Sequence, residues 1–434
     1  MPSNLDCDKY RSDNGLRART QAQNRKIVSI WRFRAVQLLG FAVAVILSAG
    51  LVGCKENKAE PSKPTFTPSS VSSEARRDRV DRVLDATFVR PLDLKVHAAW
   101  QIVHGAMAFK KAYQVRNEGE SVFILDYLLK GGAMSGWTFA PGVVLDPATG
   151  HRGLISIMEP GSKSGQGHAD QWLGYLSNCG FALTDPITTG GVNYTFEDYV
   201  RQIEWDVPQN AIKEYSWTLM SLTAYRPTSY SWKASDGEVW NIEKLLELEL
   251  DQVDTERLNV GGPCGGTHRL FGIAITLKRH IAQGGEMTEI WQRAQREIEA
   301  AIELARTHQN ADGSLSTNFF SGRTGISEDL GQNLHATGHT FEFLAIALPD
   351  DRMDEAWFTL AADALCEMFE DGTELDLECG ALYHAAHGLV VYRERKWGNR
   401  PFGGMEIAGT NFIGPKEAAP DSQEPKSPPA KDSK

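Results

Sequence analysis

The chain is short of positive charge. Its 434 residues hold 45 Lys and Arg against 56 Asp and Glu, a formal net charge of −11. The first 53 residues carry eight basic and three acidic side chains, so the remainder is close to −16. A nucleic-acid partner needs a basic surface, and this deficit excludes one. An acidic surface far from neutrality mainly keeps a protein soluble.

Several patterns are also missing. The chain has no P-loop, no dinucleotide fingerprint and no Ser-His-Asp context. Its apolar run Leu38–Val52 has 15 residues, whereas a membrane-spanning helix needs about 20. Convincing alternating strands are scarce, and helical periodicity dominates. The chain therefore has an all-α pattern and no marker of nucleotide or serine-hydrolase chemistry.

Cysteine is scarce as well. Of six cysteines, four fall in the globular part: Cys179, Cys264, Cys366 and Cys379. In an exported protein four cysteines can pair in three ways. A domain of this size does not need disulfide bonds for its stability. Four buried, reduced cysteines are therefore an equal alternative.

The N-terminus has the pattern of an export signal. A basic stretch precedes Leu38–Val52, and Gly53-Cys54 follows. Leu51-Val52-Gly53-Cys54 resembles the bacterial lipobox. This resemblance implies a lipoprotein signal peptide over residues 1–53 and a diacylglyceryl group on Cys54. The mature protein would then be a secreted lipoprotein of the cell envelope, periplasmic or at the surface, with the lipid membrane as its partner. An uncleaved membrane anchor is the alternative.

Composition divides the rest of the chain. Residues 54–76 are rich in Pro, Ser, Thr and Lys, which predicts a flexible tether. Residues 404–434 are predicted to form a disordered tail. Residues 77–403 are enough for one large domain.

Helical segments of two kinds alternate along this domain. Outer segments have charged faces typical of helices that cover a core; they are expected near Arg77–Ala86, Ser121–Lys130, Thr195–Trp205, Glu238–Asp251, Met287–His308 and Asp354–Phe369. Inner segments have few charges and many small residues; they are expected near Val96–Tyr113, His168–Cys179, Ala211–Tyr225, Thr267–Ile281, Ala336–Leu348 and Ala381–Arg393.

Polar groups recur near the starts of the inner segments, which predicts one common pocket. The expected ligand-binding residues are His97, His168, Trp172, Trp217, His268, Arg269, His339 and His384. Two pairs share a helix face: His97 with His104, and His335 with His339. Parallel helix N-termini together with histidine and arginine predict a positive cup, which suits an anionic ligand such as a uronic-acid glycan.

A turn and two helix starts carry a family resemblance. Gln309-Asn310-Ala311-Asp312-Gly313-Ser314-Leu315 resembles the Gln-x-x-Asp-Gly-x-Trp turn of terpenoid cyclase and prenyltransferase toroids, with Leu315 replacing the Trp. Cys264–Leu270 and Thr337–Glu342 are similar to a group of bacterial secreted six-hairpin proteins. The resemblance implies an (α/α)6 toroid of six helical hairpins. Some of that group are labelled ADP-ribosylation-factor-directed GTPase activators, which does not suit an exported lipoprotein that meets no cytosolic GTPase.

The resemblance also bears on chemistry. The acid motifs of the cyclases, Asp-x-Asp-Asp and Asp-Cys-Thr-Ala-Glu, are absent. Prenyltransferase and lanthionine-cyclase toroids bind zinc through Cys and His, which implies the candidate metal ligands Cys264, His268, Cys379 and His384. The alternative is that both cysteines are small packing residues. Many six-hairpin toroids process glycans with paired carboxylates; the catalytic candidates here are Asp170, Glu214, Glu342 and Glu378.

Three interpretations remain open. The leading one is an exported, lipid-anchored toroid protein whose central pocket binds or processes a glycan or another anionic polar ligand. The second is a non-catalytic binding or scaffold lipoprotein of the cell envelope. The third is a zinc-dependent toroid enzyme. The residues leave open whether the protein is an enzyme and which cofactor it takes.

Replacing the lipobox cysteine tests the export prediction. Cys54→Ala removes the thiol that would carry the lipid, so we expect the variant to lose palmitate labelling and membrane retention. Labelling followed by fractionation measures both. A variant that is labelled as strongly as the wild type would refute the lipobox assignment.

Overall fold

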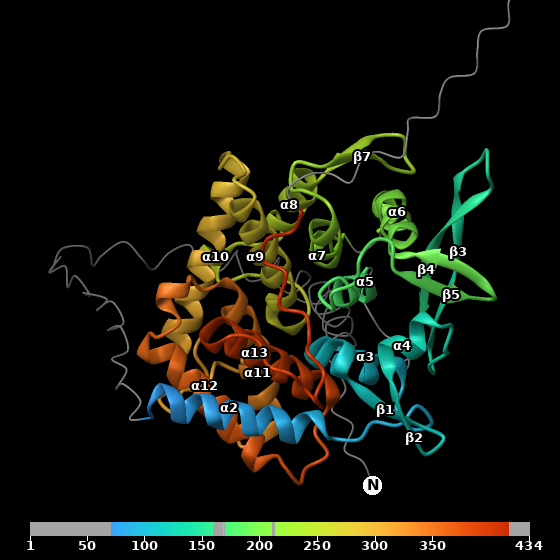
Figure 1. The fold of residues 1–434 in the computed structure, drawn as a ribbon. Helices are drawn as coiled ribbons and strands as arrows, with labels where there is room; N and C mark the ends of the chain where they lie inside the picture. The colour runs from blue at the N-terminus through green and yellow to red at the C-terminus, as the bar shows by residue number, and fades with distance from the viewer. Residues whose placement is uncertain (1–70, 159–167, 169, 211–212, 416–434) are drawn as a thin grey trace, which may run out of the picture. The chain divides into compact units, whose positions relative to one another are not determined.

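The computed structural model describes residues 71–158, 168, 170–210 and 213–415 (Figure 1). All of them belong to one compact unit, residues 63–434. The described residues form twelve α-helices and only small sheets, so the fold is helix-rich, as expected. None of these helices is both long and apolar enough to cross a bilayer. The predicted signal peptide, Cys54 and the predicted tether up to residue 70 lie outside the described residues.

Six helices are buried over most of their length, and we call them the inner helices. They are α3 (Ala99–Phe109), α5 (Gln171–Leu176), α7 (Ser216–Tyr225), α9 (Thr267–Ala282), α11 (Leu330–Ala347) and α13 (Cys379–Trp397). Each contacts the next one along the chain, and α13 contacts α3. The series of contacts therefore returns to its starting helix.

The other six helices are amphipathic, and we call them the outer helices. They are α2 (Ser73–Phe88), α4 (Ile124–Leu129), α6 (Phe196–Asp206), α8 (Ile242–Leu250), α10 (Glu289–His308) and α12 (Ala356–Asp371). In α10, Trp291, Ala294 and Ile298 are buried at intervals of three and four residues, which places them on one face. Inner and outer helices alternate along the chain.

Four antiparallel hairpins accompany the helices: β1–β2 (Gln114–Asn117, Glu120–Phe123), β3–β4 (Trp137–Asp146, His151–Met158), β5–β6 (Pro186–Thr189, Val192–Thr195) and β7–β8 (Ser231–Lys233, Val239–Asn241). Three of them lead directly into α4, α6 and α8. The largest, β3–β4, lies in the long connection between α4 and α5. Trp137 and Phe139 are buried on alternate positions of β3, a short strand pattern that the neighbouring glycines and proline hide.

Five 3-10 turns complete the secondary structure: Lys110–Ala112, Val207–Gln209, Thr255–Arg257, Cys264–Gly266 and Asp350–Arg352.

Both ends of the domain differ from expectation. Helix α2 begins at Ser73, where the Ser72 hydroxyl caps the first turn, so the tether ends before residue 76. Residues 404–415, expected to be disordered, pack on the helices. Ile407 is buried, and the Thr410 hydroxyl donates to Glu394 at 2.9 Å. Composition does not reveal this, because specific hydrogen bonds hold the segment, among them those from Lys110 to the Ala408 carbonyl and from Arg279 to the Asn411 carbonyl.

Glycines allow the inner helices to approach closely. A Cβ on Gly338 of α11 would lie 2.6 Å from the Cβ of Ala385 on α13, and one on Gly388 of α13 would lie 3.0 Å from the Glu342 backbone. Figure 1 shows α11 and α13 side by side. Likewise, a Cβ on Gly272 of α9 would meet the Ser216 backbone of α7 at 2.7 Å. The small residues seen in the sequence therefore bring neighbouring helices together.

Filling this contact tests the packing. Gly338→Val places atoms where Ala385 already lies, so we expect a loss of about 1–3 kcal/mol in the free energy of unfolding. Urea unfolding followed by circular dichroism measures it. Gly325→Val is the control, because no atom lies within 4 Å of a Cβ at that position. Equal stability of the two variants would contradict the close contact.

Candidate metal centre

Histidines from five of the inner-helix regions meet in one cluster. His384 of α13 lies at its middle, with ring centroids 5.1 Å from His104 of α3, 5.1 Å from His268 of α9 and 4.1 Å from His339 of α11. His168, just before α5, lies 5.9 Å from His268. Five inner-helix regions therefore contribute to one cluster. His339, however, lies in the middle of α11, because this helix begins at Leu330 and not near Ala336 as expected.

The ring of His268 is the least satisfied group in this cluster. It is the second residue of α9 and is 7 % exposed. Neither of its ring nitrogens has a hydrogen-bond partner among the described residues. A buried polar group left without a partner destabilises the fold by about 1–3 kcal/mol. Such a group is a candidate for binding a ligand.

Two neighbouring imidazoles are oriented by hydrogen bonds that their Nδ1 atoms donate. His339 Nδ1 lies 2.8 Å from the backbone oxygen of His335. Because a carbonyl oxygen only accepts, Nδ1 carries the proton and Nε2 keeps a free lone pair. His384 Nδ1 lies 2.7 Å from Glu342 Oε2, which again leaves Nε2 free.

Glu342 of α11 holds two histidines of α13 at once. Its second oxygen, Oε1, lies 2.5 Å from His387 Nδ1. Burial raises the pKa of Glu342, and the hydrogen bond from His387 opposes this shift. A cation bound to His384 would further favour the carboxylate form. A carboxylate that holds the second nitrogen of a ligating histidine is a regular feature of protein metal sites.

The three buried histidines fit a metal ion. His268, His339 and His384 each place one ring nitrogen within 4.8 Å of the other two. Burial, reinforced by neighbouring histidines, lowers the pKa of His384 to about 3 and the pKa values of His268 and His339 well below 6.5. All three are therefore neutral at pH 7, the form that binds metals, so no proton competes with the ion.

Two further groups with metal-ligand spacing adjoin this one. Cys264, His335 and His339 form the first, and His168, Glu214 and His268 form the second. In the second, however, His168 Nδ1 and Glu214 Oε2 lie 2.6 Å apart and bond to each other. Glu214 is therefore better placed to orient His168 than to bind an ion.

The cluster continues towards α3 and α5 through hydrogen bonds. His104 Nδ1 lies 2.5 Å from the Trp100 carbonyl, so its Nε2 accepts, and the Tyr175 hydroxyl lies 3.5 Å from it. Trp217 packs against His268 with ring centroids 5.1 Å apart. Of the two tryptophans expected at the site, Trp217 therefore belongs to the cluster.

Three of the expected ligand-binding residues have other partners. His97 bonds to the Asp93 backbone, outside the cluster. Trp172 stacks on Trp137 of β3 at 4.3 Å. Arg269 is buried in an ion pair with Glu249 of α8 at 2.7 Å, which corrects its expected role in ligand binding. Consecutive helix residues differ by about 100° in direction, so His268 faces inward while Arg269 turns to α8.

Other candidates have structural positions. Cys379 is buried at the start of α13 and belongs to none of the metal-spaced groups among the described residues. Glu378 caps α13 by accepting from two backbone N–H groups. Asp170 accepts from the Thr218 hydroxyl at 2.5 Å, and burial raises its pKa to about 6. No disulfide joins the four cysteines of the described residues.

Sequence reasoning undervalued two histidines. His335 and His104 were noted only for sharing helix faces with His339 and His97, yet both belong to the cluster. The four-residue spacing of His335 and His339 was the available signal. The expected positive cup is also corrected. Burial lowers the pKa values of His268 and His339 well below 6.5, so these rings are neutral at pH 7, and Arg269 is paired with Glu249.

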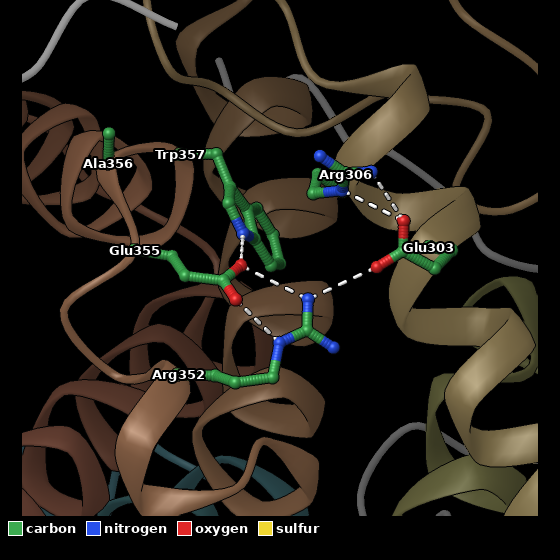
Figure 2. A pocket seen from close by; sticks show the side chains of 6 residues that line it. All are labelled: Glu303, Arg306, Arg352, Glu355, Ala356 and Trp357. Atoms are coloured by element: carbon green, nitrogen blue, oxygen red, sulfur yellow. Dashed lines mark hydrogen bonds and ion pairs between the residues drawn. The ribbon is translucent and has the colours of Figure 1, made fainter. Parts of the chain in front are cut away.

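A surface pocket elsewhere lacks comparable chemistry. It has a volume of about 460 Å³ and is lined by Glu303, Arg306, Arg352, Glu355, Ala356 and Trp357 (Figure 2). Its charges are already paired: Arg352 bonds to Glu303 at 3.1 Å and to Glu355 at 2.7 Å. None of the expected site residues lines it.

Comparisons with protein-family models, curated proteins and solved structures return no match. The resemblance to cyclase-like toroids stays a prediction.

The neutral cluster predicts how stability depends on pH. Because the folded pKa of His104 lies near 3 and a free histidine titrates near 6.5, the unfolded chain binds more protons between these values. The contribution of the neutral His104 ring to the free energy of unfolding is therefore present above about pH 6.5. As the pH falls below this value, that contribution is lost at about 1.4 kcal/mol per pH unit. We expect His104→Gln to show a shallower loss of stability between pH 6 and 5.

Urea unfolding in the presence of a chelator measures this slope without a metal contribution. His97→Gln is the matched control, because its ring lies outside the cluster. Equal slopes for His104→Gln and the wild type would show that His104 is not held neutral.

Proposed function

We propose that the twelve helices form an (α/α)6 toroid of six helical hairpins. The closed series of contacts through the six inner helices supports this arrangement, as does the alternation of inner and outer helices. In such a toroid the inner helices run parallel to one another, and their starts surround one site. A cluster of histidines contributed by α3, α9, α11 and α13 fits this geometry.

We propose that the protein binds a divalent transition-metal ion through His268, His339 and His384. The observation that carries this proposal is the buried ring of His268, whose nitrogens have no partner among the described residues. His339 and His384 offer Nε2 atoms beside it, each fixed by a bond at Nδ1. Imidazole ligands suit zinc, copper, nickel and iron.

The ligand number favours zinc and a catalytic type of site. Structural zinc sites are usually closed by four protein ligands, whereas catalytic sites have three and keep one position for water or substrate. A metal ion in such a site polarises a bound carbonyl or makes bound water a stronger nucleophile. This chemistry corresponds to the zinc-dependent toroid enzyme among the three interpretations.

The metal also bears on the expected anionic ligand. The neutral histidines supply no positive charge, but a divalent ion would supply it in a buried site where charge interactions are strong. A carboxylate group, as in an acidic glycan, would then bind at the open position. Export and lipid anchoring at Cys54 remain part of this proposal, and a binding protein without catalysis differs from it only in turnover.

Metal titration of single variants tests the proposal. The full chain is stripped with a chelator and titrated with Co²⁺ at pH 7, and the visible absorption of the bound ion is followed. We expect one ion per chain in the wild type. Removing one of three ligands, as in His339→Ala or His384→Ala, should weaken binding by more than about 100-fold, because even residues that only orient ligands contribute about 10–100-fold.

His97→Ala is the matched control, since this histidine lies outside the cluster. Circular dichroism establishes that each variant is folded. Absence of stoichiometric binding in the wild type, or equal weakening by His97→Ala, would overturn the metal assignment.

A further inference from the structure

We infer that Cys264 and His335 form an entry site for the metal ion, and that His339 passes the ion from them to His268 and His384. The inference rests on the proposed metal-binding function and adds the route by which the ion reaches the buried ligands.

The entry residues lie directly beside the buried ones. Cys264, His335 and His339 each place a ligand atom within 4.8 Å of the other two. His335 and His339 are one turn apart on α11, with ring centroids 4.4 Å apart. Cys264 lies four residues before His268, in the 3-10 turn that leads into α9. One short turn and one helix face therefore connect the two ligand sets.

The entry residues are more exposed to solvent than the buried ligands, as entry of an ion from solvent requires. Cys264 and His335 are partly exposed. His268 is 7 % exposed, and His339 and His384 are each 2 % exposed. An ion from solvent can reach the first set before it reaches the second.

The hydrogen bond of His339 prevents two ions from occupying the two ligand sets at the same time. Its Nδ1 donates to the His335 carbonyl, so only Nε2 can bind metal. Nε2 has a single lone pair and therefore binds one ion. Because His339 belongs to both ligand sets, an ion held by one set prevents a second ion from filling the other. The two sets are successive positions of one ion.

The donor types suit transfer. A thiolate binds borderline and soft ions such as zinc well, and it must lose its proton to do so. Capture at Cys264 forms a metal–sulfur bond and releases one proton to water. Transfer to His268 and His384 breaks that bond, and the sulfur takes a proton back from water. The neutral imidazoles need no proton change, so the step is balanced.

Loading kinetics of the full chain test the inference. Stopped-flow mixing of the stripped protein with Co²⁺ should show a transient thiolate-to-cobalt absorption that rises and decays before the final spectrum. We expect Cys264→Ser and His335→Gln each to slow loading at least tenfold and to leave one ion bound at equilibrium. Cys379→Ser is the matched control, because this cysteine lies at the start of α13 but belongs to no metal-spaced group among the described residues.

His268→Ala separates the two stages. This variant keeps the entry residues, so it should show the fast thiolate signal without its decay. Wild-type loading rates in both Cys264→Ser and His335→Gln would overturn the entry site while leaving the metal centre in place. A thiolate signal that persists at equilibrium in the wild type would overturn it too, because Cys264 would then be a permanent ligand. If the wild type binds no ion, the entry site fails together with the proposed function.

Discussion

The close contact between α11 and α13 determines the geometry of the histidine cluster. Gly388 lets the backbone of α13 meet that of α11 at Glu342, and Gly338 lets α11 meet Ala385 one turn away. At this separation the Glu342 carboxylate reaches both His384 and His387. A larger side chain at either glycine would part the helices and remove the bonds that orient His384. The site therefore depends on backbone packing before it depends on any ligand.

Much of the helical pattern could be predicted from sequence, because buried and amphipathic helices differ in charge along their whole length. The convergence of His168, His268 and His384 agrees with their repeated place near inner-helix starts, whereas His339 lies in the middle of α11. The side of the helix on which each of these residues lies could not be predicted so well. His268 and Arg269 are neighbours in sequence, yet one faces the cluster and the other pairs with Glu249. That choice depends on a partner helix whose position the sequence does not give.

Other errors have equally local causes. The β3–β4 hairpin was hidden by the glycines and proline around its alternating residues. Glu378 was a catalytic candidate because it lies at a helix start, and the same position makes it a cap. The segment 404–415 is held by specific contacts, such as those of Ile407 and Thr410, which average composition does not reveal.

Charge links the candidate site to its proposed chemistry. Burial makes the histidines neutral, so the cluster has many nitrogen lone pairs and little positive charge of its own. A divalent ion would use those lone pairs and supply the charge that an anionic ligand needs. The same ion would also balance the buried carboxylate of Glu342, which has two imidazoles as hydrogen-bond partners.

Diffraction from zinc-loaded crystals of the full chain, recorded at the zinc absorption edge, tests the central claim most directly. The account predicts one anomalous peak about 2.0–2.1 Å from a ring nitrogen of each of His268, His339 and His384. A peak elsewhere on the protein, with these three rings free of metal, would contradict it.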